Sequence, residues 1–206
     1  LLSRERVCAG AEKTLLSPRP ETLSVMLREG LLAACRIDGD YELHALKTVS
    51  AEPDVRWAML KVLVPALDLR QFRLPSRRVK LVETAAAAYR PSYTREALKE
   101  LIAASGEDAA RVCAKLSGQE ALLEKILQSG ECVSLRGLAV NGRDFPALHG
   151  KAAGDMLRRL LDYVLLHPED NNRQTLLRLA EEWSGNSDAD GHKDVGDVKC
   201  QQKDTL

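Results

Sequence analysis

The sequence predicts an all-α protein, built as an elongated array of several helices. Aromatic residues make up only 4% of the chain, whereas strands are enriched in aromatic and β-branched residues. Leucine and alanine, which favour helices, supply much of the hydrophobic 45%. Apolar residues recur at helical spacing, and prolines and glycines separate the segments. A chain of 206 residues with this composition can bury a core.

The first part of the chain divides into helices separated by breakers. Ser3 can cap the first helix, which runs through Leu15, and the Ser-Pro-Arg-Pro run at 17–20 ends it. Residues 31–37 are apolar and are expected to form a short buried segment before a turn at 38–40. Further helices are expected over residues 23–30, 54–64, 76–88, 94–104 and 107–116.

Local signals also indicate how some of these helices begin. Ser76 is expected to cap the helix that follows it. Residues 117–120 (SGQE) match a capping box, in which the serine and the glutamate satisfy each other's backbone donors. The helix after this box is expected to end at Ser129–Gly130.

A glycine-rich stretch at 131–150 marks a change of composition and a domain seam. Two helices are expected after it. The first ends before His167, and the second is capped by Asn172 and ends near Trp183. Residues 185–206 are polar and mixed in charge, so we expect this segment to be disordered.

Bulk charge and cysteine usage exclude some classes of protein. The formal net charge is zero, which argues against a protein that coats nucleic acid through overall basicity. The five cysteines are scattered and form no C-x-x-C pair, so neither a disulfide framework nor a zinc site is predicted. No apolar run approaches the roughly 20 residues that span a bilayer. We expect a cytoplasmic protein with no membrane partner, cut from a longer chain because it begins without methionine.

Motifs for catalysis or metal binding are few. Residues 38–40 (DGD) have the D-x-D spacing of nucleotidyl transferases, but such carboxylates normally lie on a strand, so we interpret the motif as a solvated turn. The histidines show no ligand spacing, and His44 is expected to pack within an apolar helix. No catalytic residue, metal site or cofactor is therefore predicted in this chain.

Basic residues concentrate in one window of this neutral chain, where they outnumber the acidic ones. They are Arg70, Arg73, Arg77, Arg78, Lys80, Arg90, Arg95 and Lys99. The planar fork of arginine suits phosphate oxygens, so the first of these residues can line an approach to an RNA backbone. The alternative is a solvated helix face whose cations pair with acids elsewhere in the chain.

A second basic group surrounds the glycine-rich stretch. Its members are Arg136, Arg143, Lys151, Arg158 and Arg159. Asn141–Gly142 is a tight-turn dipeptide, and loops of this kind can bring backbone N–H groups close to phosphate or ribose. The alternative is a connecting loop with ordinary surface charge.

Several segments, in order, resemble the post-catalytic part of bacterial class II CCA-adding enzymes, the tRNA nucleotidyltransferase and poly(A) polymerase family. Residues 2–7 (LSRERV) are similar to the start of the neck helix of that family, and 72–75 (FRLP) to a turn of its body. The most specific match is 138–145 (LAVNGRDF), which resembles the tail signature. Gly154 with the helix after it resembles the next tail motif. Taken together, the matches cover most of residues 1–184.

The resemblance implies a neck (1–37), an RNA-binding body (38–130) and a tRNA-binding tail (131–184). In this family a separate N-terminal catalytic head binds Mg²⁺, CTP and ATP, and the body and tail hold the acceptor and T arms of tRNA. This chain would then bind tRNA and transfer no nucleotide by itself. The residues expected to contact RNA are Arg70, Arg73, Arg77, Arg78, Lys80, Arg136, Asn141, Arg143 and Arg158.

The chain departs from the family in places. Many relatives carry a His-Asp dyad in the body helix where this chain has Lys61–Val62, and 151–153 (KAA) replaces a proline-glycine pair of the tail. The first departure disfavours a degenerate His-Asp phosphohydrolase. Another class of function stays open, a helical protein-interaction or scaffold domain without RNA binding.

Overall fold

The computed structural model describes residues 3–33 and 40–187. Over these residues the secondary structure consists of α-helices and short 3₁₀ helices with no strand, which confirms the all-α prediction. The chain forms two compact units, Leu1–Gly137 and Leu138–Leu206. We call them the first unit and the second unit. The boundary between them falls inside the glycine-rich stretch where the sequence predicts a seam.

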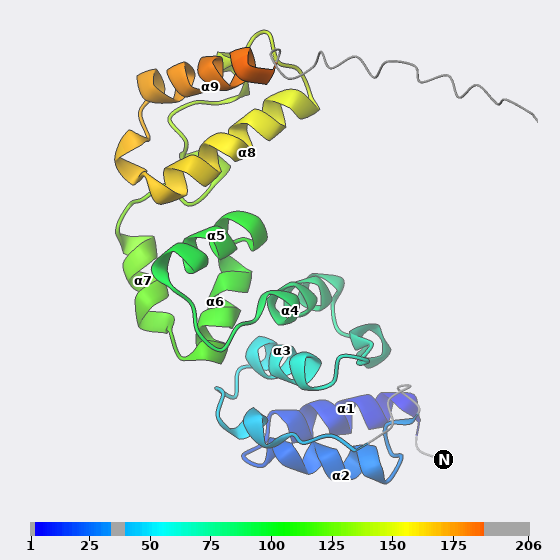
Figure 1. The fold of residues 1–206 in the computed structure, drawn as a ribbon. Coiled ribbons are helices and arrows are strands. Elements are labelled where there is room, and N and C mark those ends of the chain that lie inside the picture. Colours follow the sequence, from blue (N-terminus) through cyan, green and yellow to red (C-terminus); the bar gives the residue numbers. More distant parts are fainter. Residues whose placement is uncertain (1–2, 34–39, 188–206) are drawn as a thin grey trace, which may run out of the picture. The chain divides into compact units, whose positions relative to one another are not determined.

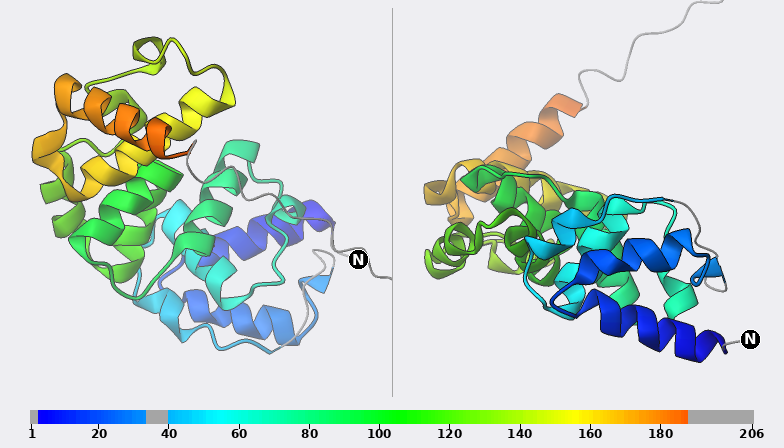
Figure 2. Two further views of the ribbon diagram at one scale, coloured as in Figure 1. Left: turned by 45° about the horizontal axis from the view of Figure 1, so that its top comes forward. Right: turned by 90° about the horizontal axis from the view of Figure 1, so that it is seen from below.

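The first unit is a stack of helices (Figures 1 and 2). Its α-helices are α1 (Arg4–Leu15), α2 (Leu23–Arg28), α3 (Pro53–Leu63), α4 (Ser76–Ala88), α5 (Arg95–Ser105), α6 (Glu107–Ser117) and α7 (Glu120–Gln128). Its 3₁₀ helices are η1 (Pro20–Thr22), η3 (His44–Lys47), η4 (Leu69–Phe72) and η5 (Leu135–Gly137). α1 pairs with α2, α3 packs on α4, and α6 contacts α3, α4, α5 and α7.

Most expected helix boundaries are confirmed. Two residues or motifs that were expected to cap the start of a helix do not do so. Ser76 is the first helical residue of α4 and caps nothing, because Pro75 occupies the N-cap position. The capping box at 117–120 does not form. Gly118 takes a left-handed conformation (φ 68°) that ends α6, and the Ser117 hydroxyl donates back to the carbonyl of Cys113 at 3.0 Å. The side chain of Gln119 instead bonds both backbone groups of Tyr93.

A single hydrophobic core runs through the first unit. Buried residues of the predicted neck, such as Leu15 and Leu27, belong to the same cluster as Trp57 and Phe72 of the predicted body. The Trp57 and Phe72 rings lie 5.0 Å apart between centroids. The apolar segment after Gly30 differs from its prediction, because Leu32 is buried but Leu31 is 48% exposed. Residues 34–39 lie outside the described residues.

Arg56 joins α1 to α3 from inside this core. It is only 6% exposed, and its Nη1 donates to the carbonyl oxygens of Leu15 and Ser17, both at 2.7 Å. These carbonyls lie at and just beyond the C-terminal end of α1, where backbone acceptors lack a partner within the helix. Burial lowers the pKa of Arg56, and the charge of Glu21 opposes that shift. The guanidinium of Arg56, on α3, therefore supplies the hydrogen bonds that the end of α1 lacks.

A second buried cation holds the end of the first unit. Lys99 on α5 is 4% exposed and pairs with Glu131 at 2.7 Å. Arg95, one turn earlier on α5, also bonds Glu131. The hydrogen bonds from Lys99 and then Arg95 lower the pKa of Glu131 from 4.5 to about 2. The segment that follows α7 is thus fixed to α5.

The second unit consists of α8 (Lys151–Leu166) and α9 (Arg173–Ser187), with η6 (Gly142–Asp144) and η7 (Pro168–Asp170). The two helices pack together through buried residues such as Leu160, Val164 and Leu176. As expected, the side chain of Asn172 accepts a bond from the backbone N–H of Thr175 (2.9 Å) at the start of α9. α9 continues past Trp183 to Ser187, beyond its expected end. The rest of the segment expected to be disordered lies outside the described residues.

Membrane insertion through a helix is not supported over the described residues. No helix among them combines the length and the hydropathy needed to cross a bilayer.

Replacing Arg56 with methionine should destabilise the first unit by about 2 to 4 kcal/mol. The change removes both bonds and leaves two carbonyl groups without a donor. Urea unfolding followed by the fluorescence of Trp57 measures the loss, in a Trp183→Phe background so that Trp57 reports alone. Lys125→Met, at an exposed position of α7, is the control, with an effect below about 0.5 kcal/mol. An unchanged urea midpoint for Arg56→Met would contradict this role.

The lowered pKa of Glu131 predicts a pH-dependent contribution to stability. The contribution is complete above about pH 4.5 and is lost as the pH falls toward 2, because the carboxylate is then protonated in the folded state as well. Each pKa unit corresponds to about 1.4 kcal/mol, so the contribution is at most about 3.5 kcal/mol. Urea unfolding at several pH values should show the gap between the wild type and Glu131→Gln shrinking from pH 5 to pH 2. A gap that stays constant would disprove the assignment.

Candidate nucleic-acid interface

The expected RNA contacts of the first unit lie on η4, on α4 and in the turn between them. Arg70 and Lys80 are exposed, and no ion pair over the described residues joins either to an acid. Arg73, Arg77 and Arg78, in contrast, are all paired with acids. Arg73 follows η4 in a left-handed conformation (φ 56°) and bonds Glu5 of α1. The basic residues between positions 70 and 80 therefore fall into two groups, those with an acidic partner and those without one over the described residues.

The paired arginines of α4 differ in accessibility. The Arg77 side chain is 90% exposed and meets Asp108 of α6 at 3.3 Å. Arg78 is held more firmly, because its Nε lies 2.8 Å from Asp54 of α3 and its side chain is only 34% exposed. An exposed pair such as Arg77–Asp108 contributes about 0 to 1 kcal/mol, so an incoming phosphate can replace the acid. Arg78 serves mainly to join α4 to α3.

A hollow of about 450 Å³ opens between α3, α4 and α6, and we call it the α4–α6 groove. Its basic lining residues are Arg77, Arg78, Arg111 and Lys115, and its acidic ones are Glu52, Asp54 and Asp108. Arg111 and Lys115 are also paired, with Glu124 and Glu52 respectively. Alternating charges thus line the groove, in place of a continuous positive wall.

A second hollow, of about 360 Å³, shares the Arg77 side of α4. Lys80 and Thr84 line it from α4, and Gly106 and Glu107 line it at the start of α6. Arg77 and Lys80 are thereby brought together on one exposed face of α4. Within the first unit, this face is the best candidate for contact with an anionic backbone.

Residues 141–144, which we call the signature turn, lie within the segment that resembles the tail signature. Side chains of the turn itself hold its shape. The Asn141 side chain accepts from the N–H of Arg143 at 3.0 Å, and Asp144 accepts from the N–H of Asn141 at 2.8 Å. Together these residues form a capping box around η6. Arg173 of α9 donates to Asp144 at 2.7 Å, and this bond followed by the Asn141 backbone bond lowers the pKa of Asp144.

Asn141 is exposed, as Gly142 and Arg143 are, but its side chain also holds the turn. Asn141, expected to contact RNA, uses its side-chain oxygen to shape the turn. Gly142 and Arg143 are exposed at its tip, and no ion pair over the described residues occupies Arg143. Leu138, Val140 and Phe145 of the same signature are buried.

The two remaining candidates lie apart from these groups. Arg136 is exposed on η5 and belongs to the first unit. Arg158 is exposed on α8 and pairs with Asp155 one turn away, at 2.8 Å. Sequence reasoning did not select Arg111 and Lys115 of the groove, whose contribution depends on the packing of α6 against α4.

Two other expectations concern possible chemistry. His44 is exposed on η3 and lies 3.5 Å from Glu42, so the expectation that it packs in an apolar helix is wrong. Leu43 and Leu46 of that segment fill the core instead. In the D-x-D motif, Asp38 lies outside the described residues and Asp40 pairs with Arg28 at 3.3 Å.

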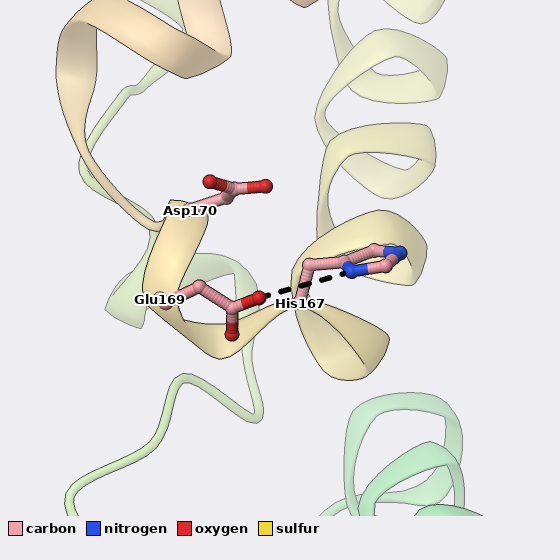
Figure 3. A group of neighbouring side chains, drawn as sticks. All are labelled: His167, Glu169 and Asp170. Carbon is pink, nitrogen blue, oxygen red and sulfur yellow. Dashed lines mark ion pairs between the residues drawn. The ribbon is translucent and has the colours of Figure 1, made fainter.

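His167, Glu169 and Asp170 gather at the turn between α8 and α9 (Figure 3). Their possible ligand atoms lie within 4.8 Å of one another. Local contacts account for all three. The Tyr163 hydroxyl donates to Asp170 at 2.6 Å, the Tyr163 ring lies 4.5 Å from that of His167, and His167 Nδ1 lies 3.9 Å from Glu169. Exposed groups of this kind often gather at turns without an ion, so we assign no metal site to them.

Comparison with protein-family models, with curated proteins and with solved structures finds no match for this chain. The case for a function therefore depends on the residues themselves.

Replacing Asn141 with alanine should destabilise the second unit by about 1 kcal/mol, as for loss of a capping side chain. Urea unfolding followed by the fluorescence of Trp183 measures it. Arg143→Ala in the same turn is the matched control and should leave stability within about 0.5 kcal/mol of the wild type. If Asn141→Ala weakened RNA binding without altering stability, the structural role would be wrong.

Proposed function

We propose that this chain is the tRNA-binding portion of a CTP/ATP:tRNA nucleotidyltransferase that builds or repairs the 3′-terminal CCA of tRNA, without its catalytic head. The resemblance of residues 138–145 and of the helix after them to the tail signature is the starting point. The observation that carries the proposal is the signature turn, whose capping box leaves Arg143 exposed at its tip and unpaired over the described residues.

The exposed face of α4 supports the same function independently. Arg77 and Lys80 line one hollow together, and Arg70 is exposed on η4. Guanidinium and ammonium groups spaced along a surface suit the sugar-phosphate backbone, which double-stranded RNA presents in a regular A-form geometry. Recognition would then depend on the shape of the acceptor and T arms more than on their sequence.

Nucleotide transfer is assigned to the catalytic head that would precede this chain. Over the described residues no strand carries paired carboxylates, so this part of the chain has no such site for the Mg²⁺, CTP and ATP that a head of this family binds. The described part of the chain would hold and orient the RNA. We infer a cytoplasmic setting, where tRNA maturation takes place.

A second candidate is a helical protein-interaction domain without RNA binding. The alternating charges of the α4–α6 groove favour it, because Glu52, Asp54 and Asp108 would repel phosphates but suit a partner segment of mixed charge. The pairing of Arg73 and Arg78 inside the first unit points the same way. A folded protein that binds no tRNA minihelix would favour this candidate.

A gel-shift titration with an acceptor–T minihelix tests the proposal. We expect binding that weakens as the salt concentration rises, since phosphate contacts release counterions. Arg143→Ala should weaken binding and lower the salt slope by about 0.7 to 0.9. The triple variant Arg70→Ala, Arg77→Ala, Lys80→Ala should lower the slope by about 2 to 3. Arg73 and Arg78 stay unchanged because they join helices.

Two control variants test whether the loss of any positive charge weakens binding. They are Lys125→Ala in the first unit and Arg178→Ala in the second. Lys125 is exposed away from both hollows, and Arg178 pairs with Glu182 one turn along α9 at 2.7 Å. Both controls should bind like the wild type. Equal binding by the wild type and by the Arg143 and triple variants would count against the proposal.

A further inference from the structure

A strip of planar side chains crosses one face of the second unit. Arg159 and Tyr163 are four residues apart on α8, a spacing that places them on one side of the helix. His167, the residue that follows α8, continues the strip through its contact with Tyr163. Trp183 of α9 meets this side. Arg159 and His167 are exposed, and Tyr163 and Trp183 are half-buried.

The contacts along the strip are one cation–π contact, one edge-on ring contact and one tilted ring contact. The Arg159 guanidinium carbon lies 4.2 Å from the centroid of the Trp183 ring. Tyr163 meets Trp183 edge-on, at 6.1 Å and 72°, and lies 4.5 Å from the His167 ring at 32°. The bond from the Tyr163 hydroxyl to Asp170 fixes the middle of the strip. These planes are therefore held in place before any ligand arrives.

Arg159 differs from the other arginines near it in how its charge is used. Over the described residues, Arg158 pairs with Asp155, Arg173 with Asp144 and Arg178 with Glu182, whereas no ion pair joins Arg159 to an acid. The Arg159 guanidinium instead lies over the indole face of Trp183. A guanidinium whose carbon lies over an indole ring has its opposite face and its N–H edge available to a ligand.

We propose that the Arg159–Trp183 stack binds an unpaired nucleobase of the RNA. The inference rests on the proposed function and adds to it a contact with a base, where the other candidates contact only the backbone. The base stacks on the outer face of the guanidinium, which Trp183 holds in plane. The N–H groups at the edge of Arg159 donate to the neighbouring phosphate or to the edge of the base. Aromatic rings and arginine planes suit such bases, because every base offers a flat face.

The stack also has a purely structural explanation, since a cation over an indole ring stabilises the packing of α9 on α8. That role predicts a change in thermal stability without any change in RNA binding. A test must therefore measure contact with the base and stability separately.

Tryptophan fluorescence provides the direct measurement. The chain has two tryptophans, and Trp57 is buried at 1% exposure, so a bound base acts mainly on Trp183. Titration of the whole chain with the acceptor–T minihelix should quench the fluorescence, and Trp183→Phe should abolish the quenching. A minihelix of the same stem, closed at both ends by ethylene-glycol linkers, has no unpaired base and should bind without quenching.

Substitutions at Arg159 separate stacking from charge. Arg159→Ala should weaken minihelix binding about fivefold to one-hundredfold, the range for loss of one stacked base. Arg159→Lys keeps the charge but loses the plane, and should weaken binding nearly as much. Arg178→Ala, a paired arginine of the same unit, should leave binding unchanged. Melting curves of all three variants record any effect on stability.

The failures of the two proposals are distinguishable. Suppose that the wild type binds the minihelix and that Arg159→Ala or Arg159→Lys binds it equally well. Either result would overturn the nucleobase site and leave the proposed function standing. Quenching by the linker-closed RNA equal to that by the minihelix would overturn it as well. A wild-type protein that binds neither RNA would overturn the proposed function and the nucleobase site together.

Discussion

In the first unit, buried and half-buried cations bond groups that lie at or beyond the ends of its helices. A helix leaves its last carbonyl groups without partners within the helix. Arg56 donates to carbonyls at the end of α1, and the Lys61 ammonium donates to the carbonyls of Pro65 and Leu67 beyond α3, both at 2.7 Å. Lys99 neutralises Glu131 after α7. Each bond ties a group at or beyond a helix end to a side chain of α3 or α5.

This use of charge limits which cations can serve a ligand. The chain contains as many acidic as basic residues, so every cation engaged within the fold removes one from the surface potential. Arg78 illustrates the limit, because it faces the α4–α6 groove and yet is held by Asp54. Arg143 and Lys80 illustrate the opposite case, being exposed and outside the ion pairs of the described residues. The proposed RNA surface would therefore consist of separate cations, and the salt dependence of binding would reflect those cations alone.

Sequence reasoning located the helices well because local residues define their ends. Pro53, Thr94 and Gly130 act through backbone geometry within a few residues, and the structure places helix boundaries beside them. The capping box at 117–120 failed because Gly118 ends the preceding helix at the same place. The basic run was harder, since its partners Glu5, Asp54 and Asp108 are distant in sequence and become neighbours only when α1, α3 and α6 pack. In contrast, the bonds between Asn141 and Asp144 are local, and their N-x-x-D spacing was available in the sequence.

The same distinction explains why an unpaired arginine on an aromatic ring is a better nucleobase site than a paired one. An arginine held by a carboxylate must break that pair before it can bind an anion, and the carboxylate left behind repels phosphate. An indole ring carries no net charge, so Arg159 can accept a base on one face while Trp183 keeps the other. The interaction that orders the side chain is then kept in the complex, and the positive charge remains available. For a protein without net charge, the proposed arrangement would provide RNA contact without a strongly basic surface.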